Sequence, residues 1–527
     1  MTGNTFSWPR EFAMRSASRS LQLLLALLAL LALQSLAPAQ AVDEAAVDAL
    51  VAEALKAWHA PGAAVAIVRD DKVVYLKGHG VKELGSEQPV TPDTQFAIAS
   101  TSKAFTATAI AMLVDEGKMA WDDPVRKYLD YFRLADPLAD ANVTLRDLVC
   151  HRTGLSRHDL LWYGAANSRE EILRRIGFVK LDRPFRSTFQ YQNIMFLAAG
   201  QAAGAADKSS WETVVQKRIF DPLGMTGANF SVRVAAKAPD HATPHVRLSG
   251  KTRPIPWKNI DNVGPAGSIN ASARDLTRWV RFQLGDGVFE GKRLLSAARL
   301  AETHAPQMVI DMDGPTGVPS YARAANPETN VMSYGMGWVI QDFRGQHLLS
   351  HGGSIDGFRA QVALVPKAKL GIVILSNLGR TSLPEALRNS LVELLLDLPK
   401  RDWNALYLEQ TKKRLEEDRA KQKEREAKRA KGTKPSRELT AYAGTFDDPA
   451  YGPVTLMVEK EALLLKWSSH SVRLEHFHYD TFTGKDAAED SLDNPLANVT
   501  VTFTLDADGQ VAALNMLGVE FKRPKAN

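Results

Sequence analysis

The pattern of apolar and polar positions predicts a mixture of helices and strands over the first four hundred residues. Early strands, a central helical body and late strands favour one mixed sheet assembled from both ends of the chain. Apolar residues at helical spacing predict helices at 47–58, 105–113, 194–204, 211–219, 275–284 and 383–398. Short β-rich runs predict a hairpin at 63–76 and late strands at 336–341, 361–365 and 371–376.

The pattern changes twice after residue 398. Residues 409–433 are nearly all charged or Ala, with almost no apolar stripe, which predicts a solvated helix or linker and not a coiled coil. From about Leu439 short alternating strands follow, which predicts a small β-barrel or sandwich. We therefore expect a main domain at 42–400, a charged helical linker at 401–437 and a β domain at 438–527.

The N-terminal segment has the pattern of an export signal. Three arginines precede an apolar run at 21–33, and Pro38 and an Ala-Gln-Ala sequence follow it. This predicts a signal peptide at 1–41, cleaved after Ala41, and a periplasmic or secreted protein. The apolar run is shorter than the roughly 20 residues that span a bilayer, so we expect no stable membrane span after cleavage, with a retained anchor as the alternative.

Composition narrows the class of protein. A length of 527 residues fits two or three domains, and 45% hydrophobic with 24% charged residues excludes a fibre, a disordered chain and a polytopic membrane protein. The net charge of +5 comes from the linker, because residues 409–437 hold twelve basic and six acidic side chains. No aromatic residue interleaves that basic segment, so we expect no nucleic-acid partner. Cys150 is the only cysteine, which excludes an intramolecular disulfide and suggests a buried apolar position.

The strongest chemical signal is Ser100-x-x-Lys103 at the start of an apolar helical run. Positions i and i+3 share a helix face, so the Lys103 amine can lie beside the Ser100 hydroxyl. A serine hydroxyl is a weak nucleophile at neutral pH, and a partly buried lysine with a lowered pKa can activate it. Because such pairs also arise by chance, a capped helix with an exposed lysine stays the alternative on this pair alone.

Two further motifs follow in order. Tyr191-Gln192-Asn193 lies 91 residues after Ser100, and His351-Gly352-Gly353 lies 160 residues after Tyr191. With these the sequence resembles the serine β-lactamase and penicillin-binding-protein family over about residues 45–398, in particular its class C, esterase and D-aminopeptidase-like branch of peptidase S12 type. Segments 113–118, 122–125, 145–155 and 222–225 also look like family segments. The resemblance implies an α+β fold: a β-lactamase/transpeptidase-like domain whose antiparallel sheet is flanked by helices.

The resemblance also implies roles for individual residues. Ser100 would be the acylated nucleophile, with Lys103 and Tyr191 as its proton-transfer partners. Asn193 would hold Lys103 and a substrate amide by hydrogen bonds. The oxyanion hole would be the backbone N–H groups of Ser100 and Ser354, next to Gly353.

His351 departs from the penicillin-recognising pattern, which has Lys at this point to meet a substrate carboxylate. An imidazole with a pKa near 6.5 is a part-time cation, so a carboxylate would be held less firmly. This favours hydrolysis of an ordinary amide or ester over a β-lactam. His151, in His-x-Thr-Gly, we interpret as a scaffold or cleft-floor residue.

The C-terminal segments 442–446 and 476–482 resemble a lipocalin-like domain attached to some members of this family. By analogy that domain suggests homo-oligomer formation or control of access to the site. His476 and His478 alternate on a predicted strand and would share a face. No third ligand is evident, so we expect no metal, and we expect no cofactor.

We therefore expect a serine hydrolase that cleaves an amide or ester in a small molecule or peptide, a peptidase or esterase of the cell envelope. Two alternatives stay open. One is a β-lactamase, which needs the same acylation and a fast deacylation. The other is a non-catalytic sensor or binding protein that keeps the fold.

Overall fold

The structure is a computed structural model of the 527-residue chain, and it describes residues 1–4, 42–314, 321–485 and 494–524. Residues 1–44 and 45–527 form two separate compact units, and the description below concerns the second. The expected signal peptide lies almost wholly outside the described residues. Among the helices in the described ranges, none has the length and apolar character needed to cross a membrane.

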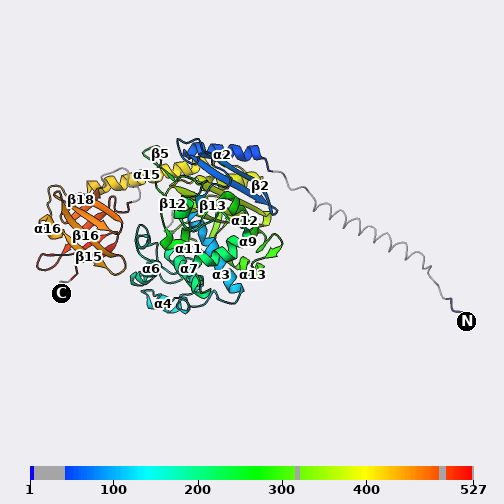
Figure 1. Cartoon of the computed structure of the whole chain (residues 1–527), viewed down its shortest axis with the longest axis horizontal. Helices are drawn as coiled ribbons and strands as arrows, with labels where there is room; N and C mark the ends of the chain where they lie inside the picture. Colours follow the sequence, from blue (N-terminus) through cyan, green and yellow to red (C-terminus); the bar gives the residue numbers. More distant parts are fainter. Residues whose placement is uncertain (5–41, 315–320, 486–493, 525–527) are drawn as a thin grey trace. The chain divides into compact units, whose positions relative to one another are not determined.

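An eight-stranded sheet forms the centre of the main domain, in the order β2-β1-β14-β13-β12-β11-β10-β9 (Figure 1). The first hairpin pairs with the last strand, with Val65 opposite Ile374, so the sheet is assembled from both ends of the chain as predicted. All its pairings are antiparallel, which confirms the expected fold class and corrects the expectation of a mixed sheet. The strands are β1 (Gly62–Arg69), β2 (Lys72–Gly80), β9 (Met308–Val309), β10 (Thr329–Tyr334), β11 (Val339–Phe343), β12 (Gln346–Ile355), β13 (Phe358–Val365) and β14 (Leu370–Ser376).

Helices pack closely against this sheet. Helix α12 (Ala273–Leu284) contacts β1 and β14, and α14 (Leu383–Leu395) contacts β13 and β14. The approach of α12 is tight, because a Cβ atom added at Gly371 would lie 2.1 Å from the Val280 side chain. Strands β1 and β14 are buried along almost their whole length, which explains their continuous apolar sequences.

The helical body surrounds helix α3 (Ser102–Asp115), in which only Asp115 escapes burial. Helix α3 contacts α7 (Asn193–Ala206), α11 (Gly264–Gly267) and α13 (Ala297–Thr303), so it is apolar on all sides. The predicted helix at 105–113 is confirmed, and its true start at Ser102 places Lys103 in the first turn.

Three predicted elements differ in detail from the structure. The helix predicted at 211–219 is α8 (Trp211–Val215) followed by a π-helical turn, Gln216–Phe220. The strand predicted at 336–341 begins only at Val339. A turn precedes it because Gly337 has φ +80° and passes so close to α3 that an added Cβ atom would lie 2.8 Å from the Lys103 carbonyl oxygen. Strand β12 was not predicted at all.

The C-terminal part is a long helix followed by a closed barrel (Figure 1). Helix α15 (Trp403–Ala427) buries only Trp403 and Tyr407, as expected for a charged linker. The barrel closes where Asp447 pairs with Lys522, which confirms the expected small all-β domain. Its strands are β15 (Gly444–Asp448), β16 (Gly452–Glu459), β17 (Ala462–Trp467), β18 (His470–His478), β19 (Thr481–Lys485), β20 (Thr500–Leu505), β21 (Val511–Met516) and β22 (Val519–Lys522).

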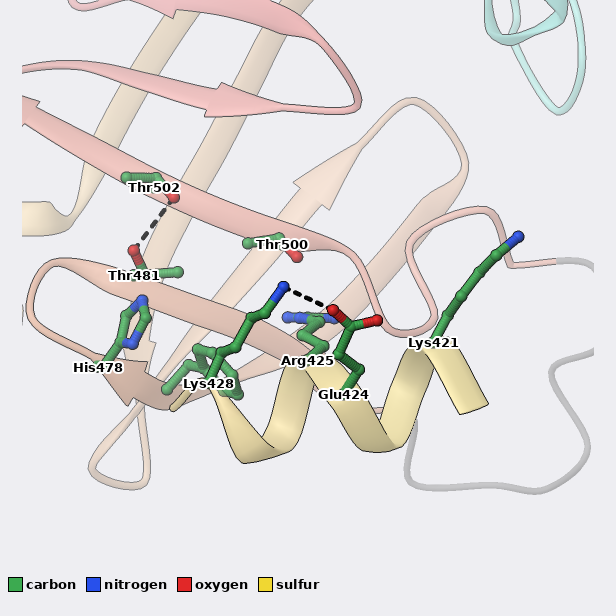
Figure 2. A pocket seen from close by; sticks show the side chains of 9 residues that line it. Lys421, Glu424, Arg425, Lys428, His478, Thr481, Thr500 and Thr502 are labelled. Atoms are coloured by element: carbon green, nitrogen blue, oxygen red, sulfur yellow. Dashed lines mark hydrogen bonds and ion pairs between the residues drawn. The ribbon is translucent and has the colours of Figure 1, made fainter. Parts of the chain in front are cut away.

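The end of α15 lies against the barrel and lines an open pocket of about 400 Å³ (Figure 2). Arg425 donates to the Thr483 hydroxyl over 2.6 Å and lies over the Phe477 ring. A bulge separates His476 from His478, and each imidazole contacts the backbone: His476 Nε2 lies 2.8 Å from the Tyr479 carbonyl oxygen, and His478 Nδ1 accepts from the Ala430 N–H. Within the described ranges no three His, Cys, Asp or Glu side chains are grouped to hold a metal ion.

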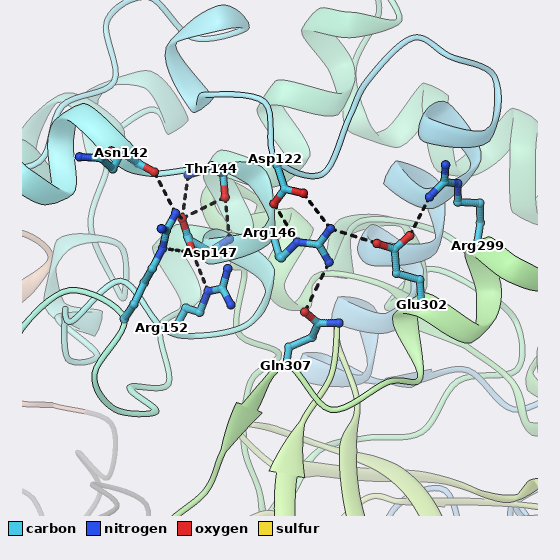
Figure 3. A network of polar contacts seen from close by, with 10 residues as sticks. Asp122, Asn142, Thr144, Arg146, Asp147, Arg152, Arg299, Glu302 and Gln307 are labelled. Atoms are coloured by element: carbon cyan, nitrogen blue, oxygen red, sulfur yellow. Dashed lines mark hydrogen bonds and ion pairs between the residues drawn. The ribbon is translucent and has the colours of Figure 1, made fainter.

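A buried carboxylate organises the segment that leads to His151 (Figure 3). Asp147 is fully buried and forms ion pairs with Arg152 (2.6 Å) and Arg186 (2.7 Å). It also closes a capping box with Thr144 at the start of α5 (Leu145–Val149). Burial alone would raise the pKa of Asp147, but the hydrogen bonds from Arg186, Thr144 and Arg152 outweigh burial and lower it.

Candidate active site

Ser100 lies in a short 3₁₀ turn, η1 (Ala99–Thr101), that leads into the N-terminus of α3. Ala99 has φ +46°, a left-handed conformation that costs a non-glycine residue roughly 1–2 kcal/mol. The helix N-terminus beside Ser100 favours negative charge there. The chain thus holds a strained turn at the position where the sequence predicts a nucleophile.

The Lys103 amine lies within hydrogen-bonding distance of three oxygen atoms. Its Nζ is 3.1 Å from Ser100 Oγ, 2.7 Å from Asn193 Oδ1 and 2.9 Å from the Ala266 carbonyl oxygen. The side chain is fully buried, and burial lowers its pKa well below 10.5; the positive charge of Arg157 lowers it further, and Asp159 opposes this. Because the alternative was an exposed lysine, this burial favours the catalytic interpretation.

The three partners of Lys103 determine where its lone pair points. The oxygens of Asn193 and Ala266 can only accept, so each takes one N–H from Lys103. A neutral amine has two N–H groups and one lone pair. In the neutral form, therefore, the lone pair faces the Ser100 hydroxyl, which is the arrangement that a general base requires.

Tyr191 packs against Lys103 and His151. Its ring lies 4.8 Å from Lys103 Nζ and 4.3 Å from the His151 ring, measured between centroids for the rings. Burial raises the pKa of Tyr191 to about 12, and a hydrogen bond with the Ser100 side chain partly offsets this. The structure thus brings Ser100, Lys103 and Tyr191 together.

Asn193 begins α7 and connects Lys103 to a carboxylate. Its Oδ1 accepts from Lys103, so its Nδ2 is the donor, and it donates to Asp159 Oδ1 over 3.0 Å. The preceding Gln192 caps α7 by accepting the Ile194 N–H. These contacts fix the orientation of the Asn193 amide.

His351 lies inside β12, where it is only 2% exposed. Its Nδ1 donates to the Gly352 carbonyl oxygen over 2.8 Å, so in the neutral ring Nε2 accepts from the Tyr334 hydroxyl at 2.9 Å. Burial, followed by the charge of Lys103, lowers the pKa of His351 to about 3. The ring is therefore neutral at physiological pH, which agrees with the expectation that a carboxylate is held less firmly here than by a lysine.

Gly353 brings β12 directly against the nucleophile turn. A Cβ atom added there would lie 2.0 Å from the Ile98 carbonyl oxygen, so only glycine allows this approach. The Thr101 hydroxyl also donates to the His351 carbonyl oxygen over 3.5 Å. Ser354, the next residue, is exposed, and the oxyanion role of its N–H group stays a prediction.

His151 lies beneath Tyr191 and is fully buried. Its Nδ1 accepts the Gln192 N–H over 3.0 Å, which places the proton of the neutral ring on Nε2. Burial and then the charge of Lys103 lower its pKa well below 6.5. This neutral ring supports Tyr191 from below, in keeping with the scaffold interpretation. The neighbouring Cys150 is buried, and burial raises the pKa of its thiol to about 12.

Two family models match the chain. One is described as beta-lactamase and matches residues 47–396, and the other is described as a domain of unknown function, DUF3471, and matches residues 428–525. The first match covers more than half of the chain. The chain belongs to the β-lactamase family.

Among curated members related to this chain, unguisins hydrolase ungD' of Aspergillus campestris is 30% identical over 443 residues, which are 79% of this chain and 78% of that protein. Protein flp of Staphylococcus aureus strain N315 is 26% identical over 346 residues, 64% of each chain.

A penicillin-binding-protein homologue from Pyrococcus abyssi, described as octameric, has a similar structure with a TM-score of 0.58 and 20% identity over 91% of this chain and 99% of that one. EstCE1, described as a hydrolase with promiscuous acyltransferase activity, has a TM-score of 0.55 and 19% identity over 66% and 97% of the two chains. At these identities the likeness shows the fold alone.

Several residues of this β-lactamase-family site were missed by the sequence reasoning. The Ala266 carbonyl holds Lys103 but carries no side-chain signature, and Gly264-Pro265 at the start of its turn was the only local signal. Asp159 holds Asn193, and Tyr334 holds His351. Both are polar residues distant in sequence from the motifs, and only the fold brings them to the site.

The C-terminal barrel contacts the loop that carries Asp159. The Gly164 carbonyl oxygen accepts from the Ser468 hydroxyl over 2.9 Å, and the Tyr163 ring stacks on His470 at 6.3 Å between centroids. His158 Nδ1 lies 2.7 Å from the Tyr451 hydroxyl. The turn between β17 and β18 is therefore in contact with the loop at 158–164.

Proposed function

We propose that the protein hydrolyses an amide or ester bond through an acyl-enzyme on Ser100. The observation that carries the proposal is the position of Lys103: a buried amine whose lone pair faces the Ser100 hydroxyl once its two N–H groups are given to Asn193 and Ala266. Membership of the β-lactamase family and the hydrolases named among its relatives support the same reaction type.

The reaction proceeds by two acyl transfers. Lys103, with Tyr191 beside it, takes the Ser100 proton as Oγ attacks the substrate carbonyl carbon, and negative charge develops on the carbonyl oxygen next to Gly353 and Ser354. The bond to the leaving group breaks as Tyr191 or Lys103 returns the proton to the departing amine or alcohol. Water then attacks the ester on Ser100, and the same groups move its proton back to Oγ.

The neutral His351 bears on the substrate class. A β-lactam has a carboxylate, which a penicillin-recognising enzyme meets with a lysine. In this chain the corresponding residue is His351, whose ring is buried and uncharged. Such a ring supplies no ionic partner. We therefore propose that the enzyme acts on ordinary amides or esters, in a small molecule or peptide. Its rate on a β-lactam should be compared with its rate on these substrates.

The cellular setting is part of the same proposal. The sequence of residues 1–41 supports export, and hence a peptidase or esterase of the cell envelope, periplasmic or secreted. Assembly of copies through the C-terminal barrel is also part of the proposal, by analogy with the lipocalin-like domain that some family members have. Light scattering after gel filtration tests this assembly, and a monomer at micromolar concentration would contradict it.

The test of function compares wild type with Ser100→Ala on p-nitrophenyl butyrate, an aminoacyl p-nitroanilide and nitrocefin. Ser187→Ala, at an exposed serine, is the control for substitution as such. We expect Ser100→Ala to lose on the order of 10³-fold or more in kcat and Ser187→Ala to keep the wild-type rate. Equal rates in wild type and Ser100→Ala would refute the proposal, and nitrocefin as the best substrate would replace it with a β-lactamase.

A further inference from the structure

Arg157 brings a second cation to the reacting groups. It lies in the loop between α5 and the short helix η3 (Asp159–Leu161), and its guanidinium carbon is 5.2 Å from the centroid of the Tyr191 ring. The same ring also neighbours Lys103 and His151. About half of the Arg157 side chain, 49%, is exposed, in contrast to the buried lysine. The guanidinium of a half-exposed arginine therefore lies over the ring of the predicted proton-transfer tyrosine.

Asp159 fixes one edge of this guanidinium. Its Oδ2 accepts from Arg157 Nε over 2.6 Å, and its Oδ1 accepts from Asn193 Nδ2 and from Trp162 Nε1, each over 3.0 Å. The carboxylate is therefore satisfied by three donors. These contacts fix the Asp159 carboxylate between Arg157 and Asn193.

The other edge of the guanidinium is available. Within the ranges that the structure describes, neither Nη atom of Arg157 has a hydrogen-bonding partner. These two amino groups form a planar pair of donors, which matches the two oxygens of a carboxylate. Because Nε is held by Asp159 and the group lies over a ring, little side-chain freedom is lost when an anion binds.

His351 occupies the position at which penicillin-recognising family members have a lysine. Its ring is buried and neutral, so this chain has no cation there. Arg157 is on a different element, the loop after His151. It is close enough to the reacting groups for its charge to act on Lys103. A substrate anion would therefore meet its cation on the Tyr191 side of the nucleophile and not on β12.

We propose that Arg157 is a substrate-binding residue that receives a carboxylate of the acyl substrate through its two Nη groups. The inference rests on the proposed acyl-enzyme function and names its substrate class: amides or esters whose acyl part has a carboxylate. Arg157 thus selects the substrate, whereas Ser100 and Lys103 perform the chemistry.

The experiment uses a matched pair of substrates, p-nitrophenyl hydrogen adipate and its methyl ester, which differ in one negative charge. Initial rates are measured with wild type, Arg157→Gln, Arg157→Lys and Arg183→Gln, the last at an exposed arginine that controls for loss of a charge. Rates of Ser100→Ala are subtracted as background. All variants are the full chain, and their circular dichroism and thermal midpoints are compared first.

We expect wild type to prefer the anionic ester, and Arg157→Gln to lose roughly ten- to a hundred-fold in kcat/KM on it, mainly through KM, as for a charge-assisted hydrogen bond. The methyl ester reports the effect of the lost charge on Lys103, so the ratio of the two kcat/KM values, anionic ester to methyl ester, should itself fall by roughly ten-fold or more in Arg157→Gln. Arg157→Lys should restore part of the preference, and Arg183→Gln should behave as wild type.

The outcomes separate this inference from the proposed function. If wild type turns over both esters through Ser100 but shows no preference for the anion, or if Arg157→Gln lowers both esters equally, Arg157 is not a carboxylate-binding residue and only this inference fails. If neither ester gives a rate above that of Ser100→Ala, the proposed function fails and this inference fails with it.

Discussion

His351 makes the folded protein sensitive to acid, and the effect can be calculated. In the unfolded chain an imidazole binds a proton with a pKa of about 6.5, whereas in the folded protein burial and then the charge of Lys103 lower the pKa of His351 to about 3. Between these values the unfolded state binds one more proton than the folded state. Stability therefore falls as the pH is lowered through 6.5 and ceases to fall, for this residue, near pH 3.

The size of the effect follows from the two pKa values. At pH 4 protonation stabilises the unfolded state by about 3 kcal/mol, and at pH 7 by well under about 1 kcal/mol, while the folded state gains almost nothing at either pH. His351 should therefore account for a loss of about 3 kcal/mol in the free energy of unfolding between pH 7 and pH 4. Other buried groups add their own losses, so the variant must be compared with wild type.

The substitution to make is His351→Gln, which keeps an acceptor for the Tyr334 hydroxyl. Urea unfolding at pH 7 and pH 4 gives the free energy of each protein. The pH-dependent loss should be smaller by about 3 kcal/mol in His351→Gln than in wild type, whatever the cost of the substitution at pH 7. His347→Gln, at an exposed position near the start of the same strand, should match wild type. A loss that is equal in wild type and His351→Gln would show that His351 is protonated in the folded protein.

Three further predictions follow from individual contacts. Lys103→Met should remove a general base and lower kcat on p-nitrophenyl butyrate by about 10³-fold with an unchanged fold by circular dichroism; a rate within ten-fold of wild type would exclude the assigned role. Gly353→Ala should separate β12 from the nucleophile turn and lower kcat by roughly 10²-fold. In Gly345→Ala the added Cβ meets nothing within 4 Å but the residue has φ +77°, so the substitution should cost roughly 1 kcal/mol of stability and leave the rate unchanged. Asp147→Asn should lower the free energy of unfolding by about 1–3 kcal/mol, because the buried carboxylate that accepts from Arg152 and Arg186 loses its charge; a loss below about 0.5 kcal/mol in urea unfolding would contradict this.

The elements that could be predicted from the sequence are those whose apolar pattern is a local consequence of burial. Helix α3 is enclosed on all sides and β14 on both faces, so each is a continuous apolar run of the right length. The barrel strands alternate because one face is inside and the other is in solvent. These apolar patterns depend only on whether a residue is buried, and not on which helix or strand packs against it.

Strand β12 could not be predicted because its two glycines and two histidines hide the pattern of a strand. It becomes a strand through pairing with β11 and β13 and through the approach of Gly353 to the nucleophile turn. The neutral state of His351 was missed for the same reason, since its burial is a property of the assembled sheet.

The candidate site shows the same division. Ser100 and Lys103 share one turn of a helix, so their contact was predictable from spacing, and the resemblance to the family supplied Tyr191 and Asn193. The backbone carbonyl of Ala266 and the carboxylate of Asp159 complete the hydrogen bonds of Lys103 and Asn193. Neither group belongs to a sequence motif. Any residue can supply a backbone carbonyl, and an aspartate in a loop has no fixed spacing from the motifs.

The most direct test of the account is whether Ser100 becomes covalently modified. The protein is incubated with a fluorophosphonate, its intact mass is measured, and the modified peptide is identified by tandem mass spectrometry. The account predicts one adduct per chain, located on Ser100, that is absent in Ser100→Ala and forms much more slowly in Lys103→Met. An adduct on another residue, or the same labelling in wild type and Ser100→Ala, would contradict the central claim.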